Sequence, residues 1–152
     1  MYYTAMKYSS EVKPRAEATP DQAMQALIGA ARVWDERLEA ALASVDLSLS
    51  KLGVLTELVN AGGDMTLGEL ADRIKCVRSN VTQLMDRLEA DGLVRRANHE
   101  SDRRRIRAEL TEAGRAKQKA GSEQLNLVHQ EFAKSFPASE RAVLVEALTV
   151  PR

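Results

Sequence analysis

A dense group of arginines marks the part of this chain best suited to contact a negatively charged partner. Six of them fall within the thirteen residues from 95 to 107 of the 152-residue sequence. They are Arg95, Arg96, Arg103, Arg104, Arg105 and Arg107. Like charges held this close repel one another, so the group indicates a functional reason for keeping them together.

The residues between and around the arginines predict a β-hairpin. Residues 98–101 (Asn-His-Glu-Ser) have the polar character of a turn, and apolar residues lie in both flanks. The flanking apolar residues are Leu93, Val94, Ile106 and Leu110. The arginines would then lie near the tip and along the exposed face of the hairpin. A basic hairpin that follows a short helix is typical of a nucleic-acid contact.

The positive charge is concentrated in one region although the whole sequence is neutral. The chain has 22 basic and 22 acidic residues. Ten basic and five acidic residues lie between Arg73 and Arg107, a net charge of +5, so the remainder carries a net charge of −5. A neutral protein with one basic module can still bind DNA through that module.

The remaining composition indicates a soluble, cytoplasmic protein without cofactors. The length suits one domain, alone or with an added helical layer, and the single cysteine, Cys76, excludes an intramolecular disulfide. No run of about eighteen apolar residues occurs, and the first residues lack the apolar core of a signal peptide. His99 and His129 have no carboxylates at ligand spacing, so we expect no metal.

Six helices are expected around the hairpin. A helix over about 20–44 begins with a capping box, in which Thr19 is the N-cap and Gln22 closes the box. A second helix follows the break at LSLS and ends at Gly62 and Gly63. Thr66 and Glu69 form another capping box that opens a short helix. Further helices are expected over 78–91, 111–134 and 138–149, and residues 1–18 show no helical period.

The expected helix over 78–91 has a polar face unlike an ordinary solvated surface. Its apolar residues, Val81, Leu84, Met85 and Leu88, share one side. Arginine can bond a guanine edge and asparagine or glutamine an adenine edge, while serine and threonine suit phosphates or thymine methyls. The candidate DNA-contacting residues of this helix are Arg78, Ser79, Asn80, Thr82, Gln83 and Arg87.

Two short helices followed by a hairpin predict a winged helix-turn-helix. The expected fold class is therefore mainly α with a small β-hairpin wing (α+β). We expect a DNA-binding domain over 46–111 and a flexible N-terminal arm over 1–18. Residues 19–45 and 112–150 are expected to form a helical dimerisation region, because the first and last helices carry more apolar residues than one packing surface uses.

At these residues the chain resembles the MarR family of transcriptional regulators. The strings VRSNVTQLMDRLEADGLVRR and SDRRRIRAELTEAG carry the resemblance, which covers about residues 24–149. It implies a homodimer whose helix from Arg78 enters the major groove of double-stranded DNA. It also implies a wing over 98–104 that reaches the minor groove, with Asp102 paired to an arginine to shape the wing. Which of Arg103, Arg104 and Arg105 enters the groove stays open, because neighbours in a strand face opposite ways.

In the family pattern the helix that begins at Arg78 is the recognition helix, which enters the major groove. Two residues just before it depart from that pattern. Members usually carry a glycine where this chain has Lys75, and a serine where it has Val77. Lys75 must adopt the backbone angles that the glycine would supply, and Val77 cannot cap the helix. Ser79 could act as the cap instead, if the helix began two residues later.

The function predicted from these patterns is a homodimeric DNA-binding regulator, a repressor, on a pseudo-palindromic operator. The resemblance implies a small aromatic or phenolic effector, for which Trp34 and Arg37 on the first helix are candidate crevice residues. The alternatives are that Trp34 is a core or dimer aromatic and that Arg37 is solvated. Alternatives are a winged-helix module for protein association without DNA binding, and an oxidant sensor acting through Cys76. No residue pattern supplies an activated nucleophile or a paired acid and base, so an enzyme is not expected.

Overall fold

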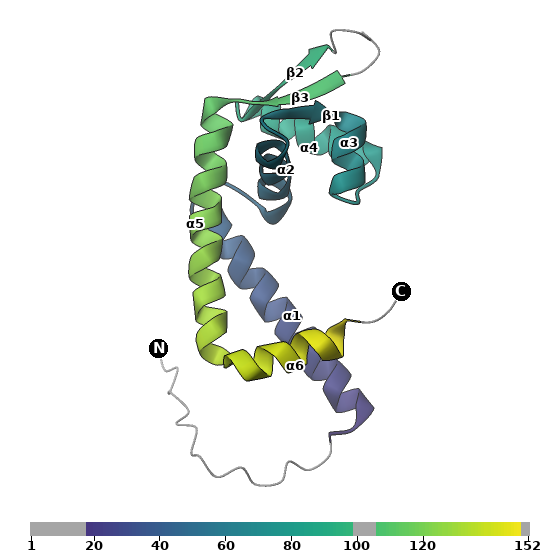
Figure 1. Ribbon diagram of the computed structural model, residues 1–152, viewed down its shortest axis with the longest axis vertical. Helices are drawn as coiled ribbons and strands as arrows, with labels where there is room; N and C mark the ends of the chain where they lie inside the picture. The colour runs from purple at the N-terminus through teal and green to yellow at the C-terminus, as the bar shows by residue number, and fades with distance from the viewer. Residues whose placement is uncertain (1–17, 99–105, 150–152) are drawn as a thin grey trace. The chain divides into compact units, whose positions relative to one another are not determined.

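The computed structural model describes residues 18–98 and 106–149 (Figure 1). The chain divides into two compact units, residues 1–34 and 35–152. The elements, in chain order, are α1 (Pro20–Ala43), α2 (Leu49–Asn60), β1 (Asp64–Thr66), α3 (Leu67–Arg73), α4 (Arg78–Ala90), β2 (Val94–Asn98), β3 (Ile106–Leu110), α5 (Glu112–Ser135) and α6 (Ala138–Leu148). The mainly helical class with a small antiparallel sheet is confirmed.

Local capping sets the helix starts that the sequence predicted. The backbone N–H of Thr19 donates to Gln22 Oε1 at 3.0 Å, and the N–H of Gln22 donates to Thr19 Oγ1 at 3.3 Å. Thr66 and Glu69 form the expected capping box at the start of α3. At the other end of α2, Gly62 and Gly63 have φ angles of +88° and +117°, which a side chain would disfavour.

The wing belongs to a three-stranded antiparallel sheet in the order β1-β3-β2. The sequence predicted only the two hairpin strands, and the third, β1, was missed. Met65 of β1 and Arg96 of β2 both pair with Ala108 of β3. A three-residue strand is too short to show a pattern of alternating apolar and polar residues. Its pairing partner also lies more than forty residues further along the chain, so no local hairpin pattern reveals it.

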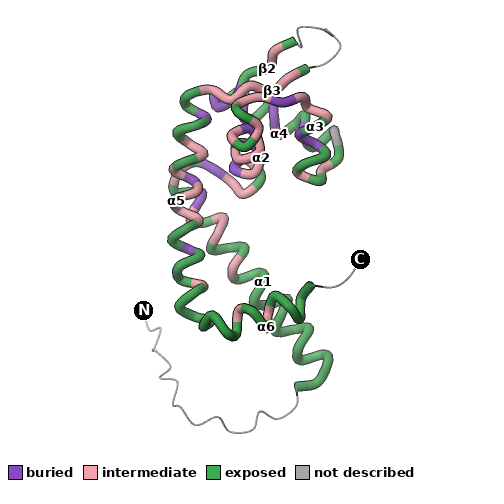
Figure 2. Tube along the Cα trace, viewed as in Figure 1, coloured by how far each residue is buried: buried purple, intermediate pink, exposed green. Residues whose placement is uncertain are grey.

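Residues 35–149 contain one apolar core, built where α2, α3 and α4 pack beside the sheet (Figure 2). Its largest fully buried side chains include Leu55, Leu58, Leu70, Met85 and Leu88. The first turn of α5 fits closely against the backbone of Leu93, the residue just before β2. A Cβ atom at Gly114 would lie 2.0 Å from the carbonyl oxygen of Leu93, so only glycine fits there. The core therefore joins α4, the sheet and the start of α5.

Helices α1 and α6 leave many apolar side chains exposed. In the first unit every described residue except the half-buried Trp34 is exposed, and Met24 is 61% exposed. In the second unit α6 has no buried residue, and Val143 and Val145 are each 65% exposed. None of the helices in the described ranges is both long and apolar enough to span a membrane.

Candidate nucleic-acid interface

Helix α4 presents a polar surface that is held in place by an apolar one. Val81, Met85 and Leu88 are at most 1% exposed and anchor the helix to the core. The residues on the other side are exposed, and most have side chains that donate or accept hydrogen bonds. They are Ser79, Asn80, Thr82, Gln83, Asp86 and Arg87. Five of these residues, all but Asp86, were predicted from sequence as DNA contacts, and that role stays a prediction. Arg78 is the first residue of the helix.

The turn before α4 contains a residue with left-handed backbone geometry. Lys75 has a φ of +51°, as expected from its place where the family pattern has glycine. The next N–H, of Cys76, donates to the carbonyl oxygen of Ala71 at 3.0 Å. Such a φ costs a residue with a Cβ atom roughly 1–2 kcal/mol, so the surrounding core must hold the turn.

The first turn of α4 has no side-chain cap. Val77 occupies the N-cap position, makes no side-chain hydrogen bond there, and is 63% exposed. The helix begins at Arg78, so Ser79 does not take over as the cap by a later start. The prediction that Val77 leaves the helix uncapped is confirmed.

Two arginines of the hairpin lie on the outer face of the sheet, in ion pairs between strands. Arg95 Nε donates to Glu109 Oε2 at 2.6 Å, and these two residues are directly opposite each other in β2 and β3. Arg107 pairs with Asp64 of β1. The side chain of Arg95 is 75% exposed, so it remains accessible to a phosphate, whereas that of Arg107 is 29% exposed.

Arg96 lies on the opposite face of the sheet from Arg95 and contacts α4. Its guanidinium pairs with Asp86 and Glu89, at 2.5 Å and 2.8 Å. The two neighbouring arginines predicted as one group of DNA contacts therefore have different surroundings. The assignment of either residue to DNA stays a prediction.

The remaining predicted wing residues, Asp102, Arg103, Arg104 and Arg105, lie outside the described residues. Within the described part of the basic region, Lys75 and Arg87 are exposed and make no ion pair. Lys75 was not among the residues predicted to bind DNA. It lies in the turn immediately before α4.

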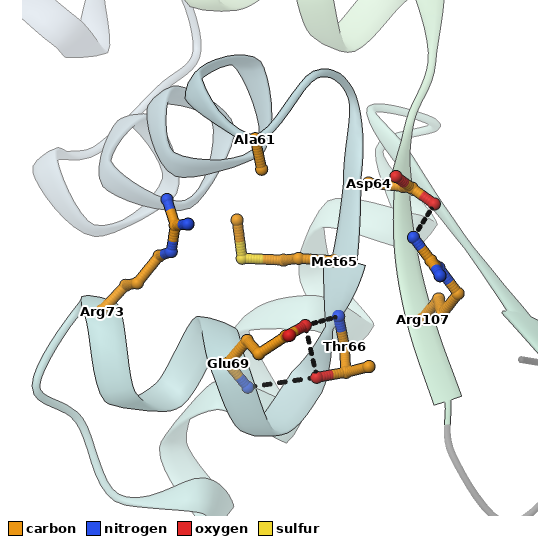
Figure 3. A pocket seen from close by; sticks show the side chains of 7 residues that line it. All are labelled: Ala61, Asp64, Met65, Thr66, Glu69, Arg73 and Arg107. Atoms are coloured by element: carbon orange, nitrogen blue, oxygen red, sulfur yellow. Dashed lines mark hydrogen bonds and ion pairs between the residues drawn. The ribbon is translucent and has the colours of Figure 1, made fainter.

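A cavity of about 350 Å³ lies near the start of α3 (Figure 3). Its lining combines the capping box and the ion pair of the outer sheet face: Ala61, Asp64, Met65, Thr66, Glu69, Arg73 and Arg107. The two predicted crevice residues, Trp34 and Arg37, do not line it. Arg37 Nη1 lies 3.5 Å from Glu131 Oε2, on α5.

Two further kinds of site considered from the sequence are an oxidant-sensing cysteine and a metal site. Cys76 is half-buried and packs against the core, which suits a small apolar residue. No three histidine, cysteine or acidic side chains in the described ranges are grouped to hold a metal ion.

Comparison with known proteins finds a family match for the middle of the chain. Residues 47–106 match the model of the MarR family. The HTH-type transcriptional repressor YetL of Bacillus subtilis (strain 168) is 36% identical over 81 residues, which cover 53% of this chain and 48% of YetL. The chain spans less than half of the length of the curated relatives that it matches.

Solved structures match over more of the chain. AbsC, a MarR family transcriptional regulator from Streptomyces coelicolor, has 27% identity and a TM-score of 0.75, covering 88% of this chain and 93% of AbsC. A mutant MarR from E. coli complexed with operator DNA has 26% identity and a TM-score of 0.72, covering 83% of this chain and 91% of that protein. The central part of the chain, residues 47–106, therefore matches the MarR family, and the fold is similar to that of solved MarR-family regulators.

Proposed function

We propose that this protein is a homodimeric transcriptional repressor that binds a specific DNA sequence. The observation that carries the proposal is the exposed face of α4, whose hydrogen-bonding side chains are held by buried residues on the other side of the helix. A MarR protein of similar fold forms a complex with operator DNA, which supports the same use here. We assign no catalytic role, since the relatives named above are transcriptional regulators.

Recognition uses two grooves. The major groove of B-DNA admits one helix, so α4 enters it and Asn80 and Gln83 bond adenine edges. Lys75 and Arg87 contact phosphates beside the groove. The wing tip reaches the adjacent minor groove through Arg103 or Arg104, where narrow A·T tracts have the most negative potential.

The exposed apolar residues of α1 and α6 support a homodimer. A surface as apolar as that of Val143 and Val145 is typical of a protein contact, and a second copy of the chain carries the same surface. A two-fold dimer presents two recognition helices, so the operator is pseudo-palindromic with half-site centres about 10 bp apart. A repressor of this kind acts by occupying a promoter.

Selection of bound sequences from a random DNA pool tests the proposal. The full chain should enrich a pseudo-palindrome, and Asn80→Ala or Gln83→Ala should relax the base preference at one position in each half-site. Arg103→Ala or Arg104→Ala should lower the slope of log K against log salt by about one unit. A winged-helix module for protein association would enrich no sequence at low salt, and that result would overturn the proposal.

We further propose that a small aromatic or phenolic molecule releases the protein from DNA, as the family resemblance implies. Trp34 is the one tryptophan of the chain, so its fluorescence is a specific probe of binding near the first helix. Titration with simple phenols should change this emission and dissociate the operator complex over the same concentration range. A release of DNA by oxidant that Cys76→Ser abolishes would instead favour the oxidant-sensing alternative.

A further inference from the structure

Arg96 is more enclosed than its neighbour and is bonded to a different element. Its side chain is 25% exposed, against 75% for Arg95. Arg95 bonds within the sheet, whereas Arg96 reaches from β2 to α4. Successive residues of a strand face opposite sides of a sheet, so the register that turns Arg95 outward turns Arg96 toward the helix.

Three residues of α4 accept hydrogen bonds from the Arg96 guanidinium. Nη2 donates to Asp86 Oδ1 at 2.5 Å and to the carbonyl oxygen of Thr82 at 3.2 Å. Nη1 donates to Glu89 Oε2 at 2.8 Å. Positions 82, 86 and 89 are spaced by four and three residues, so they lie along one side of the helix. A planar guanidinium with its donors in a fixed fork can bind all three at once.

Glu89 makes the connection rigid because it bonds to both the backbone and the side chain of Arg96. Its Oε1 accepts from the Arg96 backbone N–H at 3.1 Å while its Oε2 accepts from the guanidinium. The strand itself is thereby held to the helix. Hydrogen bonds between charged groups are about twice as strong as neutral ones, and these are partly shielded from water.

We propose that Arg96, with Asp86 and Glu89, is a positioning cluster that fixes the wing against the recognition helix. The proposal rests on the function proposed above, in which α4 and the wing read adjacent grooves. For α4 and the wing to bind the same DNA site together, the distance between them must stay fixed. Arg96 therefore acts through the position of the wing and makes no phosphate contact.

Neutralising the acidic residues of the cluster separates a positioning role from ordinary attraction to phosphates, because the two predict opposite changes in DNA affinity. Glu89→Gln and the double variant Asp86→Asn with Glu89→Gln make the surface more positive, so charge alone predicts tighter binding to all DNA. Loss of the positioning cluster predicts the opposite for the selected operator: about 3- to 30-fold weaker binding in the double variant, the range expected for a broken network. Binding to random-sequence DNA should stay equal or become tighter.

Glu109→Gln is the matched control. It makes the same charge change as Glu89→Gln, but Glu109 lies in β3 and its partner is Arg95 on the outer face of the sheet. We expect Glu109→Gln to keep full operator binding. A loss of operator binding equal to that of Glu89→Gln would contradict the proposal.

Salt dependence gives a second readout that folding defects cannot imitate. Arg96→Gln should weaken operator binding while the slope of log K against log salt stays within half a unit, whereas loss of a phosphate contact lowers it by about 0.9. Retained binding to random DNA shows that the variant is folded. If the wild-type chain selects no DNA sequence, the proposed function itself fails. If it binds an operator that the Asp86 and Glu89 variants bind more tightly, the positioning role alone is wrong.

Discussion

The winged domain and the terminal helices treat their apolar side chains in opposite ways. In the domain, Leu58, Leu70 and Met85 are fully buried within one chain. In α6, by contrast, Val143 and Val145 each remain 65% exposed. Burial of apolar surface contributes about 25 cal/mol per Å², so the domain has its main source of stability within one chain while α6 needs a second surface. We therefore expect folding and the proposed dimer assembly to depend on different parts of the sequence.

The largest expected effect is on the stability of the domain, at Gly114, where α5 lies close to the backbone of Leu93. Gly114→Ala places a Cβ atom against the carbonyl oxygen of Leu93. Because backbone must move to admit it, we expect a loss of roughly 3–5 kcal/mol in the free energy of unfolding. Urea denaturation would measure this loss. Gly53→Ala in α2 is the control, since its Cβ would meet nothing within 4 Å and should stabilise the protein slightly.

The next largest effect is expected on assembly. Val143→Asp or Val145→Asp puts a charge into the proposed dimer contact. We expect the free energy of dimerisation to weaken by about 2 kcal/mol, which raises the dimer dissociation constant roughly thirtyfold. Sedimentation measured over a range of protein concentrations would detect it. At a concentration where the wild-type chain and the variant are both monomeric, the free energy of unfolding of the winged domain should be the same in the two. A parallel loss of domain stability would show that the two regions are not separate.

A smaller effect is expected where the domain has an uncapped helix. Val77→Ser supplies a hydroxyl acceptor to the first turn of α4, which has none. Capping of this kind typically contributes about 1 kcal/mol, so the melting temperature should rise by a few degrees. Val77→Ala offers no acceptor and is the matched control. Equal melting temperatures for the two variants would contradict a capping effect.

The smallest effect is expected at Lys75. Lys75→Gly relieves the strain of its positive φ but adds flexibility to the unfolded chain, so we expect a net stabilisation of about 0.5 kcal/mol. Thermal unfolding would measure it, with Lys75→Ala as the control that keeps the Cβ atom. A loss of stability in the glycine variant would mean that the Lys75 side chain itself supports the turn.

Local patterns made most of the helical architecture predictable. The Thr66 and Glu69 capping box, the glycines after α2 and the apolar face of α4 each depend on residues a few positions apart. The strand β1 could not be predicted in this way, since its partners in β3 are distant in sequence. The division of Arg95 and Arg96 between two faces followed only once the strand register was known.

The sequence by itself determined where the helices begin and end, which face of α4 is polar, and that positive charge gathers beside that helix. These properties depend on neighbouring residues, whose spacing the chain keeps in any fold. Only the tertiary structure decided which arginines stay available. It pairs Arg95 with Glu109 and Arg96 with Asp86 and Glu89, because β2 packs between β3 and α4. Charges that are adjacent in sequence thereby take separate roles in space.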